Sequence, residues 1–217
     1  MKKKLLSILL CLVMVVGLLP TAAFAAGSVD INEANFPDAN FRSYVQTEFD
    51  KDGDKKLSSA EIAAVKEIIA YAKGIKNLKG IEFFTALETL NCVQCELTEL
   101  DVSKNTELTR LECWDNKLTA LDVSKNTELT SLNCGSNKLT ELDVSKNTKL
   151  EMLNCRGETL SYMKLTKLDV SQNKVLKELD CYSIKMKELN VSGCTALEEL
   201  NCGGNQLAAL DVSENTN

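Results

Sequence analysis

Apolar residues recur at a fixed spacing through most of the chain. The segment from Leu108 to Leu118 reads L-x-x-L-x-C-x-x-N-x-L, which is the leucine-rich-repeat template with cysteine in its third apolar position. That position recurs as cysteine at Cys92, Cys113, Cys134, Cys155, Cys181 and Cys202. Four of the five intervals are 21 residues and one is 26. The pattern predicts a stack of similar turns, each formed by one repeat.

The second half of each repeat follows the same template. The segment from Leu118 to Asn126 reads L-x-x-L-x-V-x-x-N. Cys95 and Cys194 stand where neighbouring repeats have asparagine, a replacement that the template allows at an inward bend. We therefore expect a mainly β solenoid in which each turn contributes two short strands to two parallel, facing sheets. Its six repeats span residues 87–217, with the last incomplete and a five-residue insertion near 157–161.

An open stack of repeats exposes its core at each end, so its terminal turns need caps. Residues 26–74 are expected to form a small helical cap, followed by a transitional turn over 75–86. Phe41, Val45 and Phe49 lie four residues apart, which predicts a first helix with one apolar stripe. A second helix is expected from Ser58 to Lys73-Gly74. Its predicted buried face consists of Ile62, Val65, Ile68 and Ile69.

The twelve residues between these two helices resemble a calcium-binding loop. Carboxylates occupy the EF-hand ligand positions one, three, five and twelve, and the carbonyl of Lys56 falls at position seven. The predicted ligands are Asp50, Asp52, Asp54, Lys56 and Glu61. Lys55 stands where the loop normally has glycine in a left-handed conformation, which predicts a weak Ca²⁺ site. The alternative is a solvated acidic turn without a metal.

The first 25 residues have the pattern of a secretion signal. Lys2, Lys3 and Lys4 precede an apolar run, and Ala23-Phe24-Ala25 supplies small residues at a cleavage position. The run is short for a membrane span, although a single-pass anchor remains the alternative. We expect cleavage after Ala25 and a secreted protein, with or without association with the cell surface, and no stable membrane insertion.

Charge and composition exclude several function classes. The 217-residue chain has a formal net charge of -6, and loss of the three leader lysines makes it -9, which disfavours nucleic acid as a partner. Histidine is absent from the sequence, so Ser-His and Cys-His nucleophile pairs and His-ligated zinc are excluded. The carboxylates fall either in the predicted calcium-binding loop or at positions that recur from repeat to repeat. We therefore expect no enzymatic activity.

The cysteines are interpreted as core residues. Export normally favours disulfides, but in-register side chains on parallel strands point the same way, which disfavours the disulfide torsion. Small thiol side chains stacked in a column pack efficiently in a narrow interior. Cys92-Val-Gln-Cys95 mimics a redox pair, yet both cysteines are explained by repeat register. Reduced thiols are the favoured prediction.

Variation between repeats distinguishes the two outward faces. In the second half-turns, Asp and Ser recur almost without change, as in Asp122 and Ser124, which is typical of a scaffold; cation binding along this ladder is an alternative. In the first half-turns the outward residues differ from turn to turn and include the residue types that carry interface energy. Partner binding is predicted at Arg110, Glu112, Trp114, Met152, Arg156, Asp180 and Tyr182. Neutral drift on a solvated face is the alternative.

The phrases LTxLDVSKNTxL and LxxLxCxxNxLT, at residues 118–129 and 129–139, resemble the nested 21-residue (IRREKO-like) class of bacterial leucine-rich repeats. The segment from Ile31 to Ile62 resembles the EF-hand-type head that precedes such repeats in secreted proteins of anaerobic Gram-positive gut bacteria. The resemblance covers nearly all of the mature chain. It implies recognition or adhesion without catalysis, with an extracellular protein or a glycan as partner. The alternative is a targeting segment of a larger cell-wall or glycan-active enzyme that continues beyond Asn217.

Overall fold

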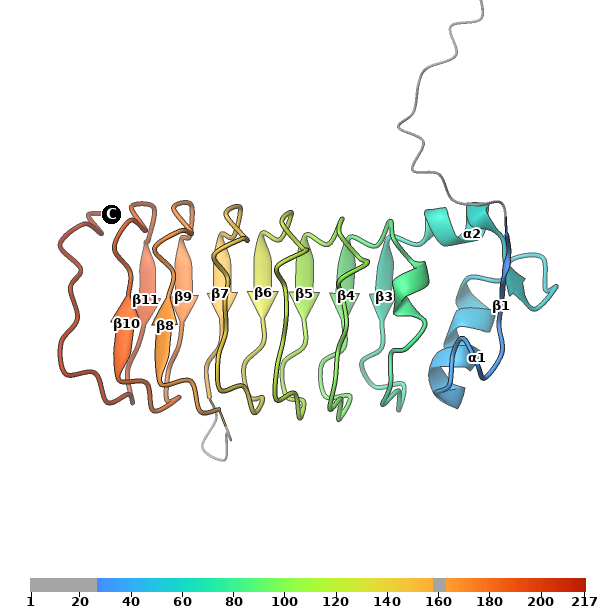
Figure 1. Ribbon diagram of the computed structural model, residues 1–217, viewed down its shortest axis with the longest axis horizontal. Helices are drawn as coiled ribbons and strands as arrows, with labels where there is room; N and C mark the ends of the chain where they lie inside the picture. Colours follow the sequence, from blue (N-terminus) through green and yellow to red (C-terminus); the bar gives the residue numbers. More distant parts are fainter. Residues whose placement is uncertain (1–26, 158–162) are drawn as a thin grey trace, which may run out of the picture.

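The computed structural model describes residues 27–157 and 163–217, which form an elongated stack of turns with a helical unit at one end (Figure 1). The predicted leader and the insertion near 157–161 lie wholly or almost wholly outside these residues. The elements are, in chain order, β1 (Val29–Asp30), α1 (Ala39–Glu48), β2 (Lys56–Leu57), α2 (Ser59–Ala64), β3 (Glu67–Ile69), η1 (Ile81–Phe83), β4 (Thr89–Asn91), β5 (Arg110–Glu112), β6 (Ser131–Asn133), β7 (Met152–Asn154), β8 (Lys167–Asp169), β9 (Glu178–Asp180), β10 (Glu188–Asn190) and β11 (Glu199–Asn201).

One layer of the stack is a seven-stranded parallel sheet, in the order β11-β9-β7-β6-β5-β4-β3. The central leucine of one strand pairs with that of the next, as Leu111 does with Leu132, and both side chains are fully buried. Each leucine is flanked by outward residues, which is the period-two alternation of a strand with one buried face. The predicted leucine-rich-repeat solenoid is confirmed.

The second layer is less regular than predicted. Its only paired strands among the described residues are β8 and β10, which lie in front of β9 and β11 in Figure 1. The other half-turns keep the inward apolar register without forming a ladder, since Leu121, Val123, Leu142 and Val144 are all buried. Their register is therefore maintained by burial and by side-chain hydrogen bonds, because interstrand backbone bonds are missing there.

Inward asparagines supply those side-chain bonds. In the second half-turns, Asn126 Nδ2 donates to the carbonyl oxygens of Val102 and Asn105 in the preceding turn, at 3.0 and 2.8 Å. Asn116, in a first half-turn, accepts from the backbone N–H of Leu97 at 2.9 Å and donates to Cys92 O at 2.8 Å. These bonds satisfy backbone groups at the bends of the coil. The predicted inward asparagine columns are confirmed.

The cap is joined to the first turns by both apolar and polar contacts. Asp38 caps α1 through Oδ1, and its Oδ2 accepts the backbone N–H groups of Lys76 and Asn77 at 2.9 and 3.2 Å. The Phe49 and Phe84 rings meet at 5.4 Å between centroids. A single carboxylate therefore fixes both the start of a helix and the path of the transitional segment.

The second helix is shorter than predicted. It ends at Ala64, and Val65 adopts an extended conformation where the sequence predicted helix as far as Gly74. Ile68 instead lies in β3, paired with Leu90, and is fully buried, whereas Ile69 is 41% exposed. Two consecutive β-branched isoleucines favour a strand, and pairing with β4 extends the main sheet by one turn. The prediction of a buried Ile69 on a helix was wrong.

Candidate functional site

The outward side chains of the seven-stranded sheet form what we call the first face. Three columns run along it, one residue from each turn in each column. The predicted partner-binding residues belong to these columns, and all of them have solvent-accessible surface. The structure places them in two clusters on either side of the turn that contains β6. One lies on β5 and the following turn, and the other spans β7, β9 and the turns that follow them.

The β5 cluster is held by polar contacts between neighbouring columns. The Arg110 guanidinium lies 2.9 Å from the Glu112 carboxylate, which also accepts a hydrogen bond from Asn133 Nδ2 at 3.0 Å. Trp114 continues the same turn and lies against Gly135 of the next one. The structure thus brings Arg110, Glu112 and Trp114 onto one continuous surface.

The second cluster centres on Arg156. Its Nη1 lies 3.5 Å from Asp180 Oδ2, and its guanidinium carbon lies 5.7 Å from the centre of the Tyr182 ring. Asp180 Oδ1 accepts the backbone N–H of Tyr182 at 3.1 Å. Tyr182 remains 41% exposed and Met152 40% exposed. An arginine held between a carboxylate and an aromatic ring keeps its remaining N–H groups in a fixed orientation.

A shallow hollow of about 460 Å³ lies next to this cluster, across β7, β9 and β11. Met152 and Asp180, both predicted partner-binding residues, line it together with Glu178, Glu199 and Asn201. The hollow makes this part of the first face concave.

The sequence analysis missed two exposed apolar residues at the start of the first face. Ile69 is aligned with Asn91 in the ladder, and Tyr71 follows two residues later with 47% exposure. The signal that identifies them is the spacing Val65-x-x-Ile68-x-Ala70, which matches the inward L-x-x-L-x-C positions of the later turns and leaves Ile69 and Tyr71 facing outward.

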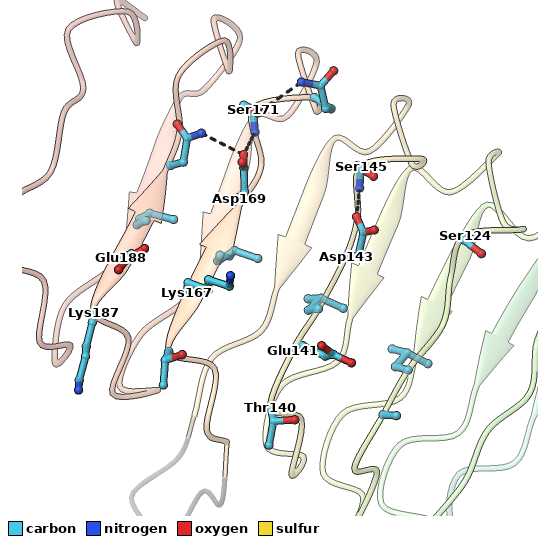
Figure 2. Close-up of a pocket in the computed structure, with 18 of the residues that line it drawn as sticks. Ser124, Thr140, Glu141, Asp143, Ser145, Lys167, Asp169, Ser171, Lys187 and Glu188 are labelled. Atoms are coloured by element: carbon cyan, nitrogen blue, oxygen red, sulfur yellow. Dashed lines mark hydrogen bonds between the residues drawn. The ribbon is translucent and has the colours of Figure 1, made fainter.

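The second face consists of the outward side chains of the second half-turns, the Asp-Val-Ser segments. In each of five turns, a serine backbone N–H donates to the aspartate two residues earlier, as from Ser145 to Asp143 Oδ1 at 2.9 Å. These bonds hold the pKa of Asp122, Asp143 and Asp169 below its usual value. A second hollow, larger than the one on the first face, lies here and measures about 1290 Å³ (Figure 2).

The predicted calcium loop brings three carboxylates together. One oxygen from each of Asp50, Asp52 and Asp54 lies within 4.8 Å of the others. Lys55 adopts φ 64°, the left-handed conformation expected at loop position six. Asp50 accepts from Lys55 N at 3.0 Å, which draws the loop around it. These carboxylates have the oxygen chemistry that suits Ca²⁺, so the donor set fits a hard cation.

Glu61 lies outside this carboxylate cluster. Its Oε1 accepts the backbone N–H of Lys51 at 2.6 Å, and its Oε2 accepts that of Ser58 at 2.8 Å. These backbone bonds and that of the Ser58 hydroxyl hold the Glu61 pKa below its usual value. Lys56 at position seven lies in β2, paired with Asp30. The structure therefore places Glu61 as the reciprocal cap of α2 and does not bring it together with the other predicted ligands.

The cysteine column lies inside the stack. The cysteines of the described residues are all free, and seven of the eight are buried, with Cys202 partly exposed. Burial raises the pKa of the Cys134 thiol to about 12 and that of Cys92 well above its usual value. Thiols with raised pKa values are unreactive at neutral pH. The interpretation of the cysteines as core residues is confirmed, and their reduced state stays a prediction.

No family model matches the chain. Over 71 residues, 33% of this chain and 8% of the relative, it is 44% identical to Internalin J of Listeria monocytogenes serotype 4b (strain F2365). The solved functional domain of InlJ from Listeria monocytogenes superposes with a TM-score of 0.67 at 37% identity, covering 88% of this chain and 46% of that domain. This is an internalin-like leucine-rich-repeat fold. The chain spans less than half of either relative.

The internalin J domain is described as including a cysteine ladder, and the column from Cys92 to Cys202 has the same character here. The internalin C2 structure from Listeria monocytogenes strain 4b F2365 superposes with a TM-score of 0.62 over 88% of this chain and 93% of that one. Its identity is 19%, so it supports the fold alone. Among the described residues, no helix has the length and apolar character to cross a membrane.

Proposed function

We propose that this protein is a secreted, non-catalytic recognition module that binds an extracellular protein through its first face. The observation that carries the proposal is the contrast between the two faces of one chain. The second face repeats the same Asp and Ser side chains from turn to turn, whereas two of the three columns of the first face vary between turns and only its middle column is mostly asparagine. A surface that diverges between otherwise identical repeats is the one free to acquire a partner-specific shape.

The chemistry of the first face supports a protein partner. Trp114, Arg156 and Tyr182 are of the three residue types that dominate interface energies. Arg156 is held by Asp180 and Tyr182, so less side-chain entropy is lost when it is covered. Internalin-like leucine-rich-repeat proteins are typically protein-interaction and adhesion modules, which agrees with this role.

The electrostatics support binding in preference to catalysis. Among the described residues, every carboxylate with a resolved pKa shift is shifted downward. General acids of hydrolases need a raised carboxyl pKa near the working pH. The shifted carboxylates of this chain are instead fixed in their charged form.

The test uses residues 26–217 against an array of extracellular proteins and glycans. A partner is expected whose affinity falls at least tenfold in Trp114→Ala or Tyr182→Ala, while the melting temperature changes by no more than a few degrees. Glu128→Ala, at an ion pair on the rim, is the matched control and should leave binding unchanged. A partner whose affinity is insensitive to both aromatic substitutions would overturn the proposal. A glycan partner would change the proposed class of partner from protein to glycan.

We also propose that the loop from Asp50 to Glu61 binds Ca²⁺ weakly. The left-handed conformation of Lys55 supports this, because it gives the loop the turn that an EF-hand loop needs despite the missing glycine. Asp50, Asp52 and Asp54 would hold the ion, with Glu61 and the Lys56 carbonyl completing the set. Isothermal titration with millimolar CaCl₂ should show heat that Asp52→Ala abolishes, because alanine has no ligand oxygen at this position.

A further inference from the structure

Lysine recurs at one corner of the coil in four consecutive turns. The corner directly follows the first half-turn, at the end to which the arrows of β5, β6, β7 and β9 point in Figure 1. The residues are Lys117, Lys138, Lys164 and Lys185. Backbone bonds fix their register, since Lys164 N–H donates to Leu139 O at 3.0 Å and Lys187 N–H donates to Thr166 O at 2.8 Å. Because adjacent backbones of a ladder lie ~4.8 Å apart, the lysines form a row along one rim of the stack.

The charge pattern changes along this row. Its first member, Lys117, lies 2.8 Å from Glu96 of the preceding turn, which also pairs with Lys76 at 3.1 Å. Lysine and glutamate pair between neighbouring turns elsewhere on the surface as well, at Lys66–Glu88, Lys149–Glu128 and Lys177–Glu151. Beyond Lys117 the row continues with lysine in each of the next three turns, so no glutamate alternates with them.

The last two lysines of the row belong to a surface that we call the lysine rim, which consists of residues 164–167 and 185–188. It contains Lys164, Lys167, Lys185 and Lys187, all exposed, and one carboxylate, Glu188. None of the four lysines takes part in an ion pair within the described part of the protein. Figure 2 shows Lys187 extending away from the labelled carboxylates. Four lysines and one glutamate give the rim a charge of +3, in a chain whose net charge is -6.

The local charge of the rim determines what it attracts. At physiological ionic strength, charges separated by more than ~8 Å are largely screened from one another. The carboxylates of distant turns therefore act weakly on a ligand that lies at the rim. Like charges in adjacent turns repel, so a ligand that places anionic groups between the lysines relieves this repulsion.

A second lysine column on the opposite rim shows that lysine in register is not enough. Lys104, Lys125 and Lys146 each follow an aspartate by three residues. Hydrogen bonds from serine and then the charge of that lysine hold the pKa of the aspartate below its usual value in all three turns. At the lysine rim, the residue three positions after Lys164 is Lys167, so compensation by a carboxylate is interrupted there.

Hydroxyl groups run beside the row. Thr140 and Thr166 each lie two residues after a lysine of the row, with a buried leucine between, so threonine and lysine both face outward. Both threonines are exposed, and their hydroxyl groups make no hydrogen bond to other described residues. The apolar residues of the rim, Leu165 and Met186, are buried. The rim therefore offers cations and hydroxyl groups without an apolar surface for a lipid or an amphipathic helix.

We propose that the lysine rim binds a linear sulfated polysaccharide. Such a polymer runs along the rim and crosses the turns, so sulfate groups on successive sugar rings would meet lysines of successive turns. Its ring hydroxyls would bond to Thr140 and Thr166. A nucleic-acid duplex fits less well, because Glu141 and Glu188 border the row and repel a wide phosphate backbone. Poly(glycerol phosphate) fits less well, because it has no ring hydroxyls for the threonines.

The test measures binding of a fluorescent heparin-derived octasaccharide to residues 26–217 by anisotropy. The octasaccharide should bind, and its affinity should fall at least threefold when sodium chloride is raised from 50 to 200 mM, because the attraction between charges is screened. A desulfated, N-acetylated octasaccharide of the same length should bind at least tenfold more weakly. Poly(glycerol phosphate) with the same number of charges should also bind more weakly than the sulfated octasaccharide.

Two double variants with the same change in net charge locate the site. Lys164→Gln with Lys185→Gln removes two charges of the rim and should weaken the sulfated octasaccharide at least tenfold. Lys104→Gln with Lys125→Gln removes two charges of the opposite rim and should change the affinity less than twofold. Both should keep a cooperative melt, because all four side chains are exposed. Trp114→Ala should leave octasaccharide binding unchanged, which separates this site from the proposed first-face function.

Four results would overturn the inference. Absence of octasaccharide binding at 50 mM sodium chloride would remove the site. Equal weakening in the two double variants would show attraction to overall charge. Equal affinity for the sulfated and desulfated octasaccharides would show that the lysines do not recognise sulfate. Tighter binding of poly(glycerol phosphate) would assign the rim to a phosphodiester polymer.

Discussion

The Trp114 indole lies directly against Gly135 of the following turn. A Cβ added at Gly135 would lie 3.0 Å from Trp114 Cδ1 and 2.7 Å from the carbonyl oxygen of Arg156. Tyr182 lies against Gly203 in the same way, and a Cβ added at Gly203 would lie 3.3 Å from the Tyr182 ring. Trp114 and Tyr182 are therefore each supported by a glycine, which fixes the orientation of the ring while one side stays exposed.

This contact predicts that Gly135→Ala disturbs the first face. The added methyl group meets backbone on one side, so the free energy of unfolding should fall by about 1–3 kcal/mol, and the indole should move. Emission from Trp114, the only tryptophan, and urea unfolding report the two effects separately. Gly203→Ala is the matched control: its Cβ meets only the movable Tyr182 ring and the Asn201 side chain, so a smaller loss is expected. Equal losses would contradict the argument.

A prediction about the inward asparagines has a natural control in this chain, because one turn has cysteine at the same position. Asn126→Ala leaves the buried carbonyls of Val102 and Asn105 without their donor, which should cost about 1–3 kcal/mol of unfolding free energy. At the equivalent position Cys194 Sγ lies 3.0 Å from Val170 O. Asn126→Cys should therefore be less destabilising than Asn126→Ala. Urea denaturation measures both, and the reverse order would show that packing outweighs hydrogen bonding at this bend.

The alternation of residues explains how much of the first face the sequence could predict. Arg110 and Glu112 flank a leucine that must face inward, so their outward direction follows from strand geometry alone. The same reasoning failed for Ile69, because Ile62, Val65 and Ile69 also satisfy the spacing of a helix. The pairing of β3 with β4 selects the strand period over the helix period for this segment. Because that pairing is a tertiary contact, the local sequence does not reveal it.

The hollow of the second face could not be predicted from the repeats. The leucine and aspartate positions are the same in turns that form the β8–β10 ladder and in turns that do not, as Leu168 and Leu142 show. The side-chain pattern fixes which residues face inward, whereas the spacing of adjacent backbones depends on the whole turn. The sequence thus predicted the chemistry of this face without its shape.

Thiol accessibility should differ sharply between the native and unfolded protein. With seven of the eight described cysteines buried, Cys202 alone should react with a thiol reagent at pH 7.5 before denaturation. Unfolding in guanidinium without reductant should release all eight in residues 26–217. A Cys202→Ser variant should show no fast reaction, which identifies the exposed thiol. Fewer than four thiols after unfolding would show that the column is bridged.

The same burial predicts loss of stability at high pH. The Cys134 pKa is raised from 9.0 to about 12 in the folded protein, so below pH 9 its thiol is protonated in both states and has no pH effect. Between pH 9 and 12 the unfolded thiol loses its proton while the folded one retains it, so stability falls by about 1.4 kcal/mol per pH unit for this group. Urea unfolding at pH 8, 9 and 10 measures the slope. Cys134→Ala should make that slope shallower, and an unchanged slope would contradict the prediction.

Lys55 gives the most direct test of the calcium loop. Its φ of 64° is unfavourable for a lysine by about 1–2 kcal/mol, and its ammonium group adds positive charge to a loop that would receive a cation. Lys55→Gly should therefore tighten Ca²⁺ binding about tenfold or more and raise the melting temperature even without calcium. Gly53 also has positive φ but lies at loop position four, with nothing within 4 Å of an added Cβ, so Gly53→Ala adds strain without changing charge. If Lys55→Gly stabilises the protein and calcium still gives neither heat nor a thermal shift, the segment is a solvated acidic turn whose carboxylates bond only to its own backbone.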